Sequence, residues 1–329
     1  MSRVILIEKE FEKNLISSLE EFGSDELAGK KVLIKLHMGE ARNRWFVDPK
    51  IVKIVVDYLK GIDAKPILFD TVVIYPSPRA FKPGYSMIAK RHGFCDLGCP
   101  VVIGDSGKDV ESEGFKFEIP SEVLDYDFMI DISHSKGHCG AGYGGAIKNI
   151  GMGCVSKKCK KLVHSQICVP AVDQDKCKMC GKCEKLCEQG AITVGKKWNI
   201  KAGLCVGCNE CIKSCPQKAL SPKNEGLCQM LAYATKAATS HMKKILFVNV
   251  LLKITKNCDC FPNSLPIIAD DIGIMVSNDM VSIDKASIDT IEKKMGKTFK
   301  EIQSIDPLDQ INTAERIGLG SSKYTLEMA

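Results

Sequence analysis

Short, continuous apolar runs recur through the first half of the chain and predict buried strands. They cover residues 31–37, 65–70, 100–105 and 126–133, and each ends in a polar residue or leads into a glycine-containing segment. Strands that are buried on both faces have this continuous pattern, whereas strands with one solvated face alternate between apolar and polar residues.

Helical periodicity appears between these runs. Residues 49–61 carry apolar side chains at helical spacing, with Pro49 in the first turn and Gly61 at the end. Strands that alternate with helices indicate a mostly parallel sheet flanked by helices. The pattern therefore predicts an α/β fold.

The same alternation returns after a cysteine-rich interruption. Residues 243–254 and 266–277 predict two more strands, and residues 282–295 predict an amphipathic helix. At 329 residues the chain is long enough for two domains. We expect an α/β domain built from residues 1–168 and 225–329, with residues 169–224 inserted as a separate unit.

The inserted segment contains the same cysteine spacing twice. Each run reads C-x2-C-x2-C-x3-C, as in bacterial ferredoxins with two [4Fe-4S] clusters, where the fourth cysteine of each run ligates the other cluster. A zinc ribbon would use two C-x2-C pairs and leave four of these cysteines without a role. The pattern predicts a ferredoxin-like α+β domain and electron transfer. The expected ligand sets are Cys177, Cys180, Cys183 and Cys215 for one cluster, and Cys205, Cys208, Cys211 and Cys187 for the other.

The composition indicates the cellular compartment of the protein. The chain has seventeen cysteines, no apolar run of a length that spans a membrane, and charged residues within its first apolar stretch. These features predict a protein of a reducing cytoplasm, without a membrane segment or secretion signal, whose cysteines ligate metal instead of forming disulfides.

The net charge of +6 does not indicate nucleic-acid binding. Residues 173–222 hold nine Lys against five Asp and Glu. Two oxidised clusters with about −2 charge each would cancel this local surplus, because cysteines bind as thiolates. The other basic residues are scattered, without an arginine-rich block or interleaved aromatic residues.

A glycine-rich segment, residues 134–154, follows the fourth predicted strand. Gly140, Gly142 and Gly145 satisfy G-x-G-x-x-G, but no acidic residue follows about twenty positions later, as a dinucleotide site requires. Glycines permit close backbone approach, either to a ligand or to another segment of the chain. Because loops at the carboxyl ends of parallel strands form the sites of such folds, we favour a ligand loop. The expected cofactor-binding residues are Gly140, Gly142, Gly144 and Gly145.

Polar residues at the predicted strand ends form the candidate catalytic set. Histidine and a buried lysine exchange protons near neutral pH. A carboxylate and a guanidinium at a strand end suit an anionic ligand, although a surface ion pair is the alternative for Asp70 and Arg79. The candidates are His37, Asp70, Arg79, His134, His138 and Lys148.

Cys258 and Cys260 form a C-x-C pair directly after the long apolar run at 243–254. In an extended segment, residues i and i+2 lie on one side, so both thiols would face one point. They predict a third metal or iron–sulfur centre, with further ligands from His134, His138, Cys139 or Cys154; the alternative is a pair of buried free thiols.

The chain resembles a family of uncharacterised iron–sulfur-centre proteins, a domain of unknown function that is often fused to a bacterial-type ferredoxin. The resemblance covers nearly the whole length and is carried by the strings LIKLHMGE, FDTVVIYPSPR, HSKGHCGAGYGGAIKNIGMGC, NCDCFP and SNDMVSIDKASID. It implies an anaerobic, cytoplasmic iron–sulfur protein, and it implies no specific reaction.

The glycine-rich segment is also similar to the lactate racemase family, which carries a nickel pincer nucleotide. That family's pattern H-x-A-G-x-S-G-G-x-K matches here at His138, Gly142, Gly144, Gly145 and Lys148, with one extra residue before the lysine and no Pro-Gly after it. The family's lysine tethers the cofactor through a thioamide. The similarity implies an α/β cleft near this loop.

Three functions are compatible with these features. The first is an oxidoreductase that passes single electrons through two clusters to a site in the α/β domain, with a redox partner protein and a small-molecule substrate. The second is a non-enzymatic electron carrier or redox subunit of a larger complex. The third is a maturation protein that handles sulfur or metal, in which the additional cysteines would be the working residues.

Overall fold

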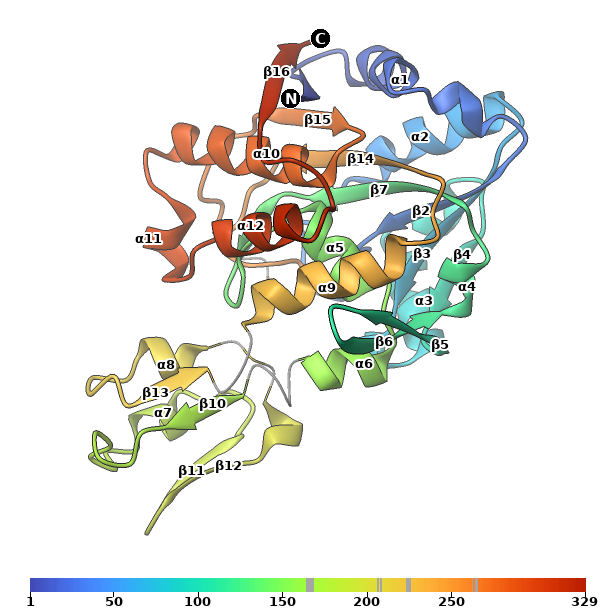
Figure 1. Cartoon of the computed structure of the whole chain (residues 1–329). Coiled ribbons are helices and arrows are strands. Elements are labelled where there is room, and N and C mark those ends of the chain that lie inside the picture. The colour runs from blue at the N-terminus through green and yellow to red at the C-terminus, as the bar shows by residue number, and fades with distance from the viewer. Residues whose placement is uncertain (164–168, 206, 208, 223–225, 262, 264–265) are drawn as a thin grey trace.

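A central eight-stranded sheet organises the molecule (Figure 1). The computed structural model describes residues 1–163, 169–205, 207, 209–222, 226–261, 263 and 266–329; Cys208, a predicted cluster ligand, lies outside them. The strand order is β16-β1-β15-β14-β7-β2-β3-β4, and within it β15 runs antiparallel to both neighbours while the other described pairs are parallel. The strands are β1 (Ser2–Ile7), β2 (Lys31–Leu36), β3 (Lys65–Thr71), β4 (Val101–Gly104), β7 (Phe128–His134), β14 (Lys244–Leu251), β15 (Gly273–Ser277) and β16 (Tyr324–Met328).

This sheet confirms the predicted α/β class. All six predicted strands are present, although the run at 243–254 forms a strand only as far as Leu251. Strand β2 shows why these runs lack alternation, because Leu33 packs into the core on one face and Val32 and Ile34 pack into the core on the other.

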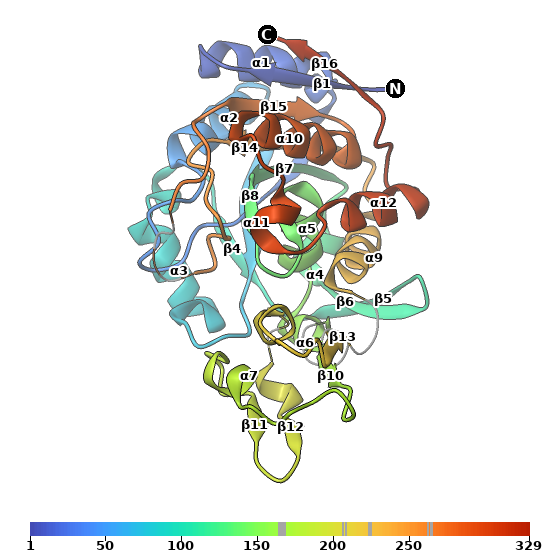
Figure 2. The same ribbon diagram turned by 90° about the vertical axis from the view of Figure 1, so that its left-hand side faces the viewer.

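Helices cover both faces of the sheet (Figure 2). The predicted helix at 49–61 has those bounds in the structure, with the Asp48 carboxylate accepting from the Lys50 N–H at 2.9 Å and Pro49 in the first turn. One face carries α1 (Phe11–Glu21), α2 (Pro49–Gly61) and α3 (Lys82–Arg91), and the other carries α5 (Ala146–Gly153), α9 (Leu227–Thr239), α10 (Met280–Met295) and α12 (Leu308–Arg316).

The helices also show where the chain changes direction. The connection from β2 through α2 to β3 leads toward one edge of the sheet, whereas the chain after β7 crosses the other face through α5 and α9 to reach β14. In open α/β sheets, such a reversal leaves a crevice at the carboxyl ends of the strands. Here the crevice lies beyond the ends of β2 and β7.

The cysteine-rich segment forms a small unit at the opposite end of the molecule from the two termini (Figures 1 and 2). Its first and last strands pair antiparallel, with Pro170 opposite Pro222, so the chain enters and leaves the unit side by side. Ile192, Trp198 and Leu220 form its core. Its elements are β10 (Pro170–Val172), α7 (Lys182–Lys185), β11 (Ile192–Val194), β12 (Trp198–Ile200), α8 (Glu210–Lys213) and β13 (Leu220–Pro222).

Smaller elements complete the α/β part. Two hairpins and three short helices lie outside the central sheet, and no helix in the described ranges is long and apolar enough to cross a membrane. These elements are β5 (Gly107–Ser112), β6 (Phe115–Pro120), α4 (Ser121–Leu124), β8 (Lys136–His138), β9 (Gly142–Gly144), α6 (Lys157–Lys161) and α11 (Phe299–Gln303).

Candidate functional site

A cavity of about 940 Å³ is lined by both the carboxyl edge of the sheet and the cysteine-rich unit. The sheet contributes residues at or just after strand ends: His37 after β2, Asp70 in β3 and the 258–260 segment after β14. The cysteine-rich unit contributes Cys187, Cys205 and Cys211. Five of the six predicted catalytic residues line this cavity: His37, Asp70, Arg79, His138 and Lys148.

Asp70 is the centre of a buried ionic cluster. Its carboxylate lies 3.2 Å from Lys35 Nζ and 3.5 Å from an Arg79 terminal nitrogen, and it accepts a short hydrogen bond from the Tyr85 hydroxyl. Burial alone would raise the pKa of Asp70, but Lys35, His37 and Arg79 together lower it to about 2. Asp70 therefore remains a carboxylate and anchors its neighbours, so it is not suited to act as a general base.

Arg79 is held rigidly in the wall of the cavity. Its guanidinium stacks 4.3 Å over the Tyr85 ring, donates to the Tyr75 hydroxyl at 3.1 Å and lies 3.6 Å from the Glu40 carboxylate. The side chain is 1% exposed. The alternative of a surface ion pair between Asp70 and Arg79 is wrong, because both side chains are buried.

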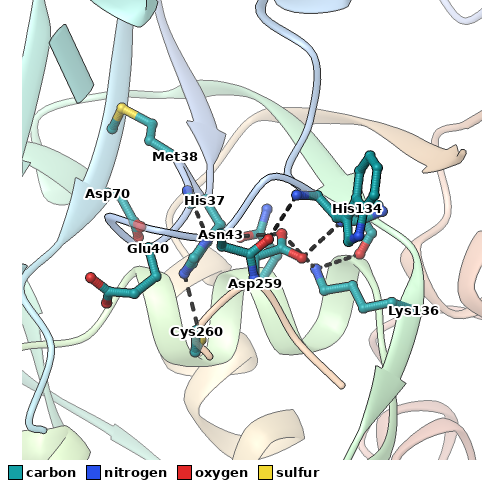
Figure 3. A network of polar contacts seen from close by, with 12 residues as sticks. His37, Met38, Glu40, Asn43, Asp70, His134, Lys136, Asp259 and Cys260 are labelled. Atoms are coloured by element: carbon teal, nitrogen blue, oxygen red, sulfur yellow. Dashed lines mark hydrogen bonds and ion pairs between the residues drawn. The ribbon is translucent and has the colours of Figure 1, made fainter. Parts of the chain in front are cut away.

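Asp259, which the sequence did not single out, fixes the loop after β14 (Figure 3). Its carboxylate accepts from His134 Nδ1 at 2.8 Å and pairs with Lys136 Nζ at 3.3 Å. His134 Nε2 faces the Leu252 carbonyl at 2.8 Å. Both ring nitrogens of His134 thus face hydrogen-bond acceptors. His134 links Asp259 to the Leu252 carbonyl, and it does not line the cavity.

Cys258 and Cys260 lie on either side of Asp259 in a tight turn. The Phe261 N–H donates to the Cys258 carbonyl at 3.1 Å, so the segment is not extended as the sequence argument assumed. The two cysteines nevertheless both line the cavity, and each influences the pKa of the other. The anchored Asp259 thus leaves both sulfur atoms in the lining of the cavity.

The surroundings of Cys260 favour a thiolate. Its sulfur lies 3.5 Å from His37 Nε2 and 3.9 Å from Lys148 Nζ. The hydrogen bond from Cys258, together with Lys148 and His37, places the pKa of Cys260 well below its usual range despite burial. The pKa of Lys148 is raised, because the charges of Cys260, Cys258 and Asp259 outweigh the effect of its burial. An ammonium beside a thiolate is the stable combination at this point.

His37 presents an N–H to Cys260. Its Nδ1 accepts from the Gly39 N–H at 3.1 Å, which leaves the proton of the neutral ring on Nε2, facing the Cys260 sulfur. Burial, followed by the charge of Arg79, lowers the pKa of His37 and so favours the neutral ring. His37 can therefore hold a proton at Nε2 next to the thiol pair.

The glycine-rich segment packs tightly against other parts of the α/β domain. Gly142 has φ +73°, and an added Cβ would lie 2.7 Å from the Ile305 carbonyl oxygen. A Cβ on Gly145 would meet the Asp284 carboxylate, and one on Gly144 would contact Lys148 Cδ at 3.4 Å. Gly140 lies against the cysteine-rich unit, where an added Cβ would be 3.2 Å from the Gly207 carbonyl oxygen. Close contacts within the chain thus oppose a side chain at Gly140, Gly142 and Gly145, whereas Gly144 has ordinary contact distances; Gly140 and Gly145 also line the cavity.

Two further sets of hydrogen bonds fix the conformation of the glycine-rich segment. His138 Nδ1 accepts from the N–H groups of Gly140 and Ala141, both at 3.1 Å, so this nitrogen is engaged by the loop itself. The Asp284 carboxylate accepts from the Ala146 and Ile147 N–H groups at 2.8 and 2.9 Å. The N-terminus of α5 is therefore already capped by a buried carboxylate, a role that no local sequence signal revealed.

The cysteine-rich unit gathers its cysteines into two groups. Cys177, Cys180, Cys183 and Cys215 line one small hollow, whereas Cys187 lies with Cys205 and Cys211 at the large cavity. Equivalent backbone contacts recur, with the Ala191 N–H donating to Cys187 Sγ and the Ala219 N–H to Cys215 Sγ, both at 3.3 Å. N–H donors stabilise thiolate ligands. Both the grouping and the donors fit two cubane clusters with crossed ligation.

The predicted third centre has less support. In the part of the chain that the structure describes, no three His, Cys, Asp or Glu side chains converge to hold a single metal ion. Cys154 is buried in the core of the α/β domain, and His134 and His138 are engaged as described above. Metal binding by Cys258 and Cys260 therefore stays a prediction.

The sequence matches the model of one known protein family. The model of the domain of unknown function DUF362 matches residues 32–289. The chain belongs to the DUF362 family. This DUF362 region begins in β2 and ends in α10, so it includes the strand ends, the glycine-rich segment and the cysteine-rich unit.

One relative matches only part of this DUF362 protein. A 56-residue stretch is 38% identical to pyruvate synthase subunit PorD of Methanothermobacter marburgensis, which is 17% of this chain and 67% of the relative.

Two solved structures are similar in part. The lactate racemase apoprotein of Thermoanaerobacterium thermosaccharolyticum is 16% identical at a TM-score of 0.39, with 75% of this chain and 50% of that chain covered. A structural-genomics protein of Thermotoga maritima is 10% identical at a TM-score of 0.46, with 90% and 59% covered. The DUF362 chain thus spans between half and three fifths of these two solved chains.

Proposed function

We propose that this chain is an iron–sulfur oxidoreductase that brings single electrons to a reaction site in the α/β cavity. The observation that carries the proposal is the shared lining: Cys187, Cys205 and Cys211 border the same cavity as His37, Lys148 and Cys260. The similarity of one stretch to a pyruvate synthase subunit supports iron–sulfur electron transfer with a partner protein.

The cysteines divide the unit into an outer and an inner end. Cys177, Cys180, Cys183 and Cys215 would hold the outer cluster, and Cys180 is exposed there, which suits electron entry from a redox partner protein. Cys205, Cys208, Cys211 and Cys187 would hold the inner one. When bound, such clusters supply one-electron transfer at potentials between roughly −700 and +450 mV.

Contacts between the two parts fix the inner end against the α/β domain. Lys213 Nζ in α8 donates to the Cys139 carbonyl at 3.0 Å, and Gly140 packs against Gly207. The glycine-rich segment therefore forms the junction between the inner cysteines and the residues of the cavity.

The cavity suits a small anionic substrate. Its lining includes seven Lys and Arg residues against four Asp and Glu residues. Lys35 and Arg79 are held by Asp70, and Lys148 lies beside Cys260, so these positive charges are fixed in place. Preorganised charges of this kind bind and orient an anion without rearrangement.

The test begins with protein purified without oxygen. Iron and sulfide analysis should give about eight of each per chain, as two cubanes require. The protein is then reduced with dithionite, and reoxidation by a panel of small anionic acceptors is followed through the visible absorbance of the clusters. Substituting Lys148→Ala should slow reoxidation by at least one acceptor about tenfold or more, equivalent to roughly 1.4 kcal/mol in the barrier.

The matched control is Lys196→Ala, which removes an exposed lysine of the cysteine-rich unit that borders neither the cavity nor the hollow of the outer cysteines. This variant should reoxidise like the wild type. If every acceptor reoxidises the Lys148→Ala protein at the wild-type rate, the cavity is not the reaction site and the chain is an electron carrier. An iron content near zero would overturn the proposal altogether.

A further inference from the structure

We propose that Cys258 and Cys260 are a redox-active dithiol that cycles to an intramolecular disulfide within the cavity and reduces a small anionic disulfide. The proposal rests on the proposed function for the source of its electrons. It adds the group that receives them and the chemical class of the substrate.

The geometry of the turn permits the bond. The two cysteines flank Asp259 in a turn that the Phe261 N–H closes onto the Cys258 carbonyl, and both line the same cavity. A disulfide requires Cα atoms roughly 4.4–6.8 Å apart. Successive Cα atoms are about 3.8 Å apart, so a turn brings residues two positions apart within that range. The ring closed by one intervening residue is strained, and strained disulfides are the easily reduced, catalytic ones.

The buried anchor of Asp259 keeps the turn closed in both redox states. Asp259 is 1% exposed and is held by His134 and Lys136, and its carboxylate also lies 3.9 Å from His37 Nδ1. Neither anchoring residue takes part in the thiol chemistry. The thiols can therefore change partners without loss of the contacts that position them.

The neighbours of Cys260 make the two thiols differ in reactivity. Lys148 Nζ lies 3.9 Å and His37 Nε2 lies 3.5 Å from the Cys260 sulfur, whereas Cys258 is 3% exposed and lies deeper. A thiolate is the nucleophile in thiol–disulfide exchange. Cys260 is thus the attacking residue and Cys258 the resolving residue.

The electron and proton balance is complete. Reduction breaks the Cys258–Cys260 bond with one proton and two electrons, which arrive one at a time through the cysteine-rich unit. It leaves a Cys258 thiol and a Cys260 thiolate. The thiolate then attacks the substrate disulfide, forms a mixed disulfide with Cys260 and releases one substrate thiolate. Attack by the Cys258 sulfur restores the internal disulfide, releases the second substrate sulfur and returns the Cys258 proton. Overall, one disulfide, two electrons and one proton give a thiol and a thiolate, and a second proton from solvent converts the thiolate to a thiol.

The first experiment measures the redox state of the pair directly. Full-length protein is equilibrated in thiol–disulfide buffers of graded ratio without oxygen, alkylated and digested, and the peptide with both cysteines is analysed by mass spectrometry. We expect a form that is lighter by two hydrogens and resists alkylation in oxidising buffers, and a doubly alkylated form in reducing buffers. A Cys258→Ser variant should show a Cys260 that is alkylated throughout, apart from mixed disulfides with the buffer. The double variant Cys95→Ser/Cys99→Ser, which removes two cysteines outside the cavity, should behave like the wild type.

Two results of this titration would overturn the proposal. If both cysteines alkylate fully in every buffer, they form no disulfide. If they resist alkylation in reducing buffers and become reactive only with a chelator, they ligate metal instead.

The second experiment counts electrons. Oxidised wild-type protein titrated with dithionite should take up about four electrons per chain, two for the clusters and two for the disulfide. Cys258→Ser should take up about two, with unchanged cluster spectra. Oxidised glutathione, a small anionic disulfide, should reoxidise the reduced wild type and regenerate the protected peptide, but should not do so with the variant. Uptake of two electrons by both proteins overturns the dithiol step and leaves the cavity proposal standing. If the protein holds no clusters but the alkylation titration shows the disulfide, the proposed function is overturned and the dithiol proposal stands.

Discussion

Three buried carboxylates in the α/β domain have different charge states, and their immediate partners explain the difference. Asp70 lies among Lys35, His37 and Arg79, which hold its pKa at about 2. Asp131 accepts hydrogen bonds mainly from neutral groups, the Ser133 hydroxyl at 2.7 Å and the Asn149 amide at 2.8 Å. Burial raises its pKa to about 7, and burial likewise raises that of Asp284 to about 6. One residue type thus serves as a fixed charge at one position and as a titrating group at two others.

Asp131 contributes to the pH dependence of the free energy of unfolding. Its pKa is about 7 in the folded protein against the ordinary 3.8, so between these values the folded state keeps a proton that the unfolded state has lost. The free energy of unfolding contributed by this group therefore falls as pH rises toward 7 and is constant above it. As pH rises from about 5.5 to 7, the free energy of unfolding of Asp131→Asn should increase relative to that of the wild type by on the order of 2 kcal/mol.

Urea unfolding of both proteins across this pH range, followed by far-UV circular dichroism, measures the difference. The variant Asp125→Asn, at an exposed position in the loop before β7, should show no such change. A difference between Asp131→Asn and wild type that is independent of pH would show that Asp131 is ionised throughout.

At the scale of elements, the glycine-rich segment acts as the packing centre between the sheet and the helices behind it. Gly142 and Gly145 admit Ile305 and Asp284 to distances that a side chain would prevent. The segment then leads into α5, whose N-terminus is capped by Asp284. The conformation of this segment is thus set by contacts with α10 and with the chain between α11 and α12.

Replacing Gly142 with alanine tests this role. Both the left-handed backbone and the contact with the Ile305 carbonyl oxygen oppose a side chain there. The backbone term alone costs about 1–2 kcal/mol. Gly29 is the matched control, because it has φ +69° and nothing within 4 Å of an added Cβ. Gly142→Ala should lower the free energy of unfolding by at least about 1 kcal/mol more than Gly29→Ala does. Equal losses in urea unfolding would mean that the contact at Gly142 relaxes without cost.

The sequence predicted elements better than it predicted their contacts. Residues 49–61 carried their own helix signals, including Asp48 and Pro49, and the bounds were confirmed. The role of Asp259 depended on His134 and Lys136, more than a hundred residues away, and no local pattern encodes such a contact. For the same reason the sequence did not reveal the two acceptors that His134 faces, and a chemical role for His134 stays a prediction. The glycine pattern was visible, but it could not distinguish contact with a ligand from contact with Ile305.

At the scale of the whole molecule, the cysteine-rich unit and the α/β domain share one cavity. The grouping of Cys187 with the downstream cysteines is the key relation, because it places the inner ligand set beside the sheet edge. The outer set lies around a separate hollow in the same unit.

Crossed ligation predicts an unusual pattern of iron loss. Cys187→Ser should reduce iron from about eight to about four per chain, because it removes a ligand of the inner cluster. Combining it with Cys211→Ser should remove no more iron, whereas combining it with Cys180→Ser should remove nearly all. Iron analysis with electron paramagnetic resonance of the reduced proteins distinguishes the cases. If Cys187→Ser and Cys180→Ser are the pair without an additive effect, each run binds its own cluster.

The paired ends of the unit predict that it can be removed. Replacing residues 170–222 with a short Gly/Ser bridge should leave a folded α/β domain, because the eight strands of the central sheet lie outside this range. Near-UV circular dichroism should retain the fine structure of packed aromatic residues. A variant that keeps its far-UV signal but loses its near-UV signal would show that the domain needs the unit to pack.

The antiparallel pairing of β10 with β13 also has a consequence for ancestry. A segment whose ends meet side by side can be gained, lost or exchanged by a single recombination event, because the host domain keeps its strand order and its crossovers. The host domain therefore accommodates either form of the chain, with the unit or without it. Loss of the unit would uncover the surface around Cys139 and Gly140, which the unit contacts here.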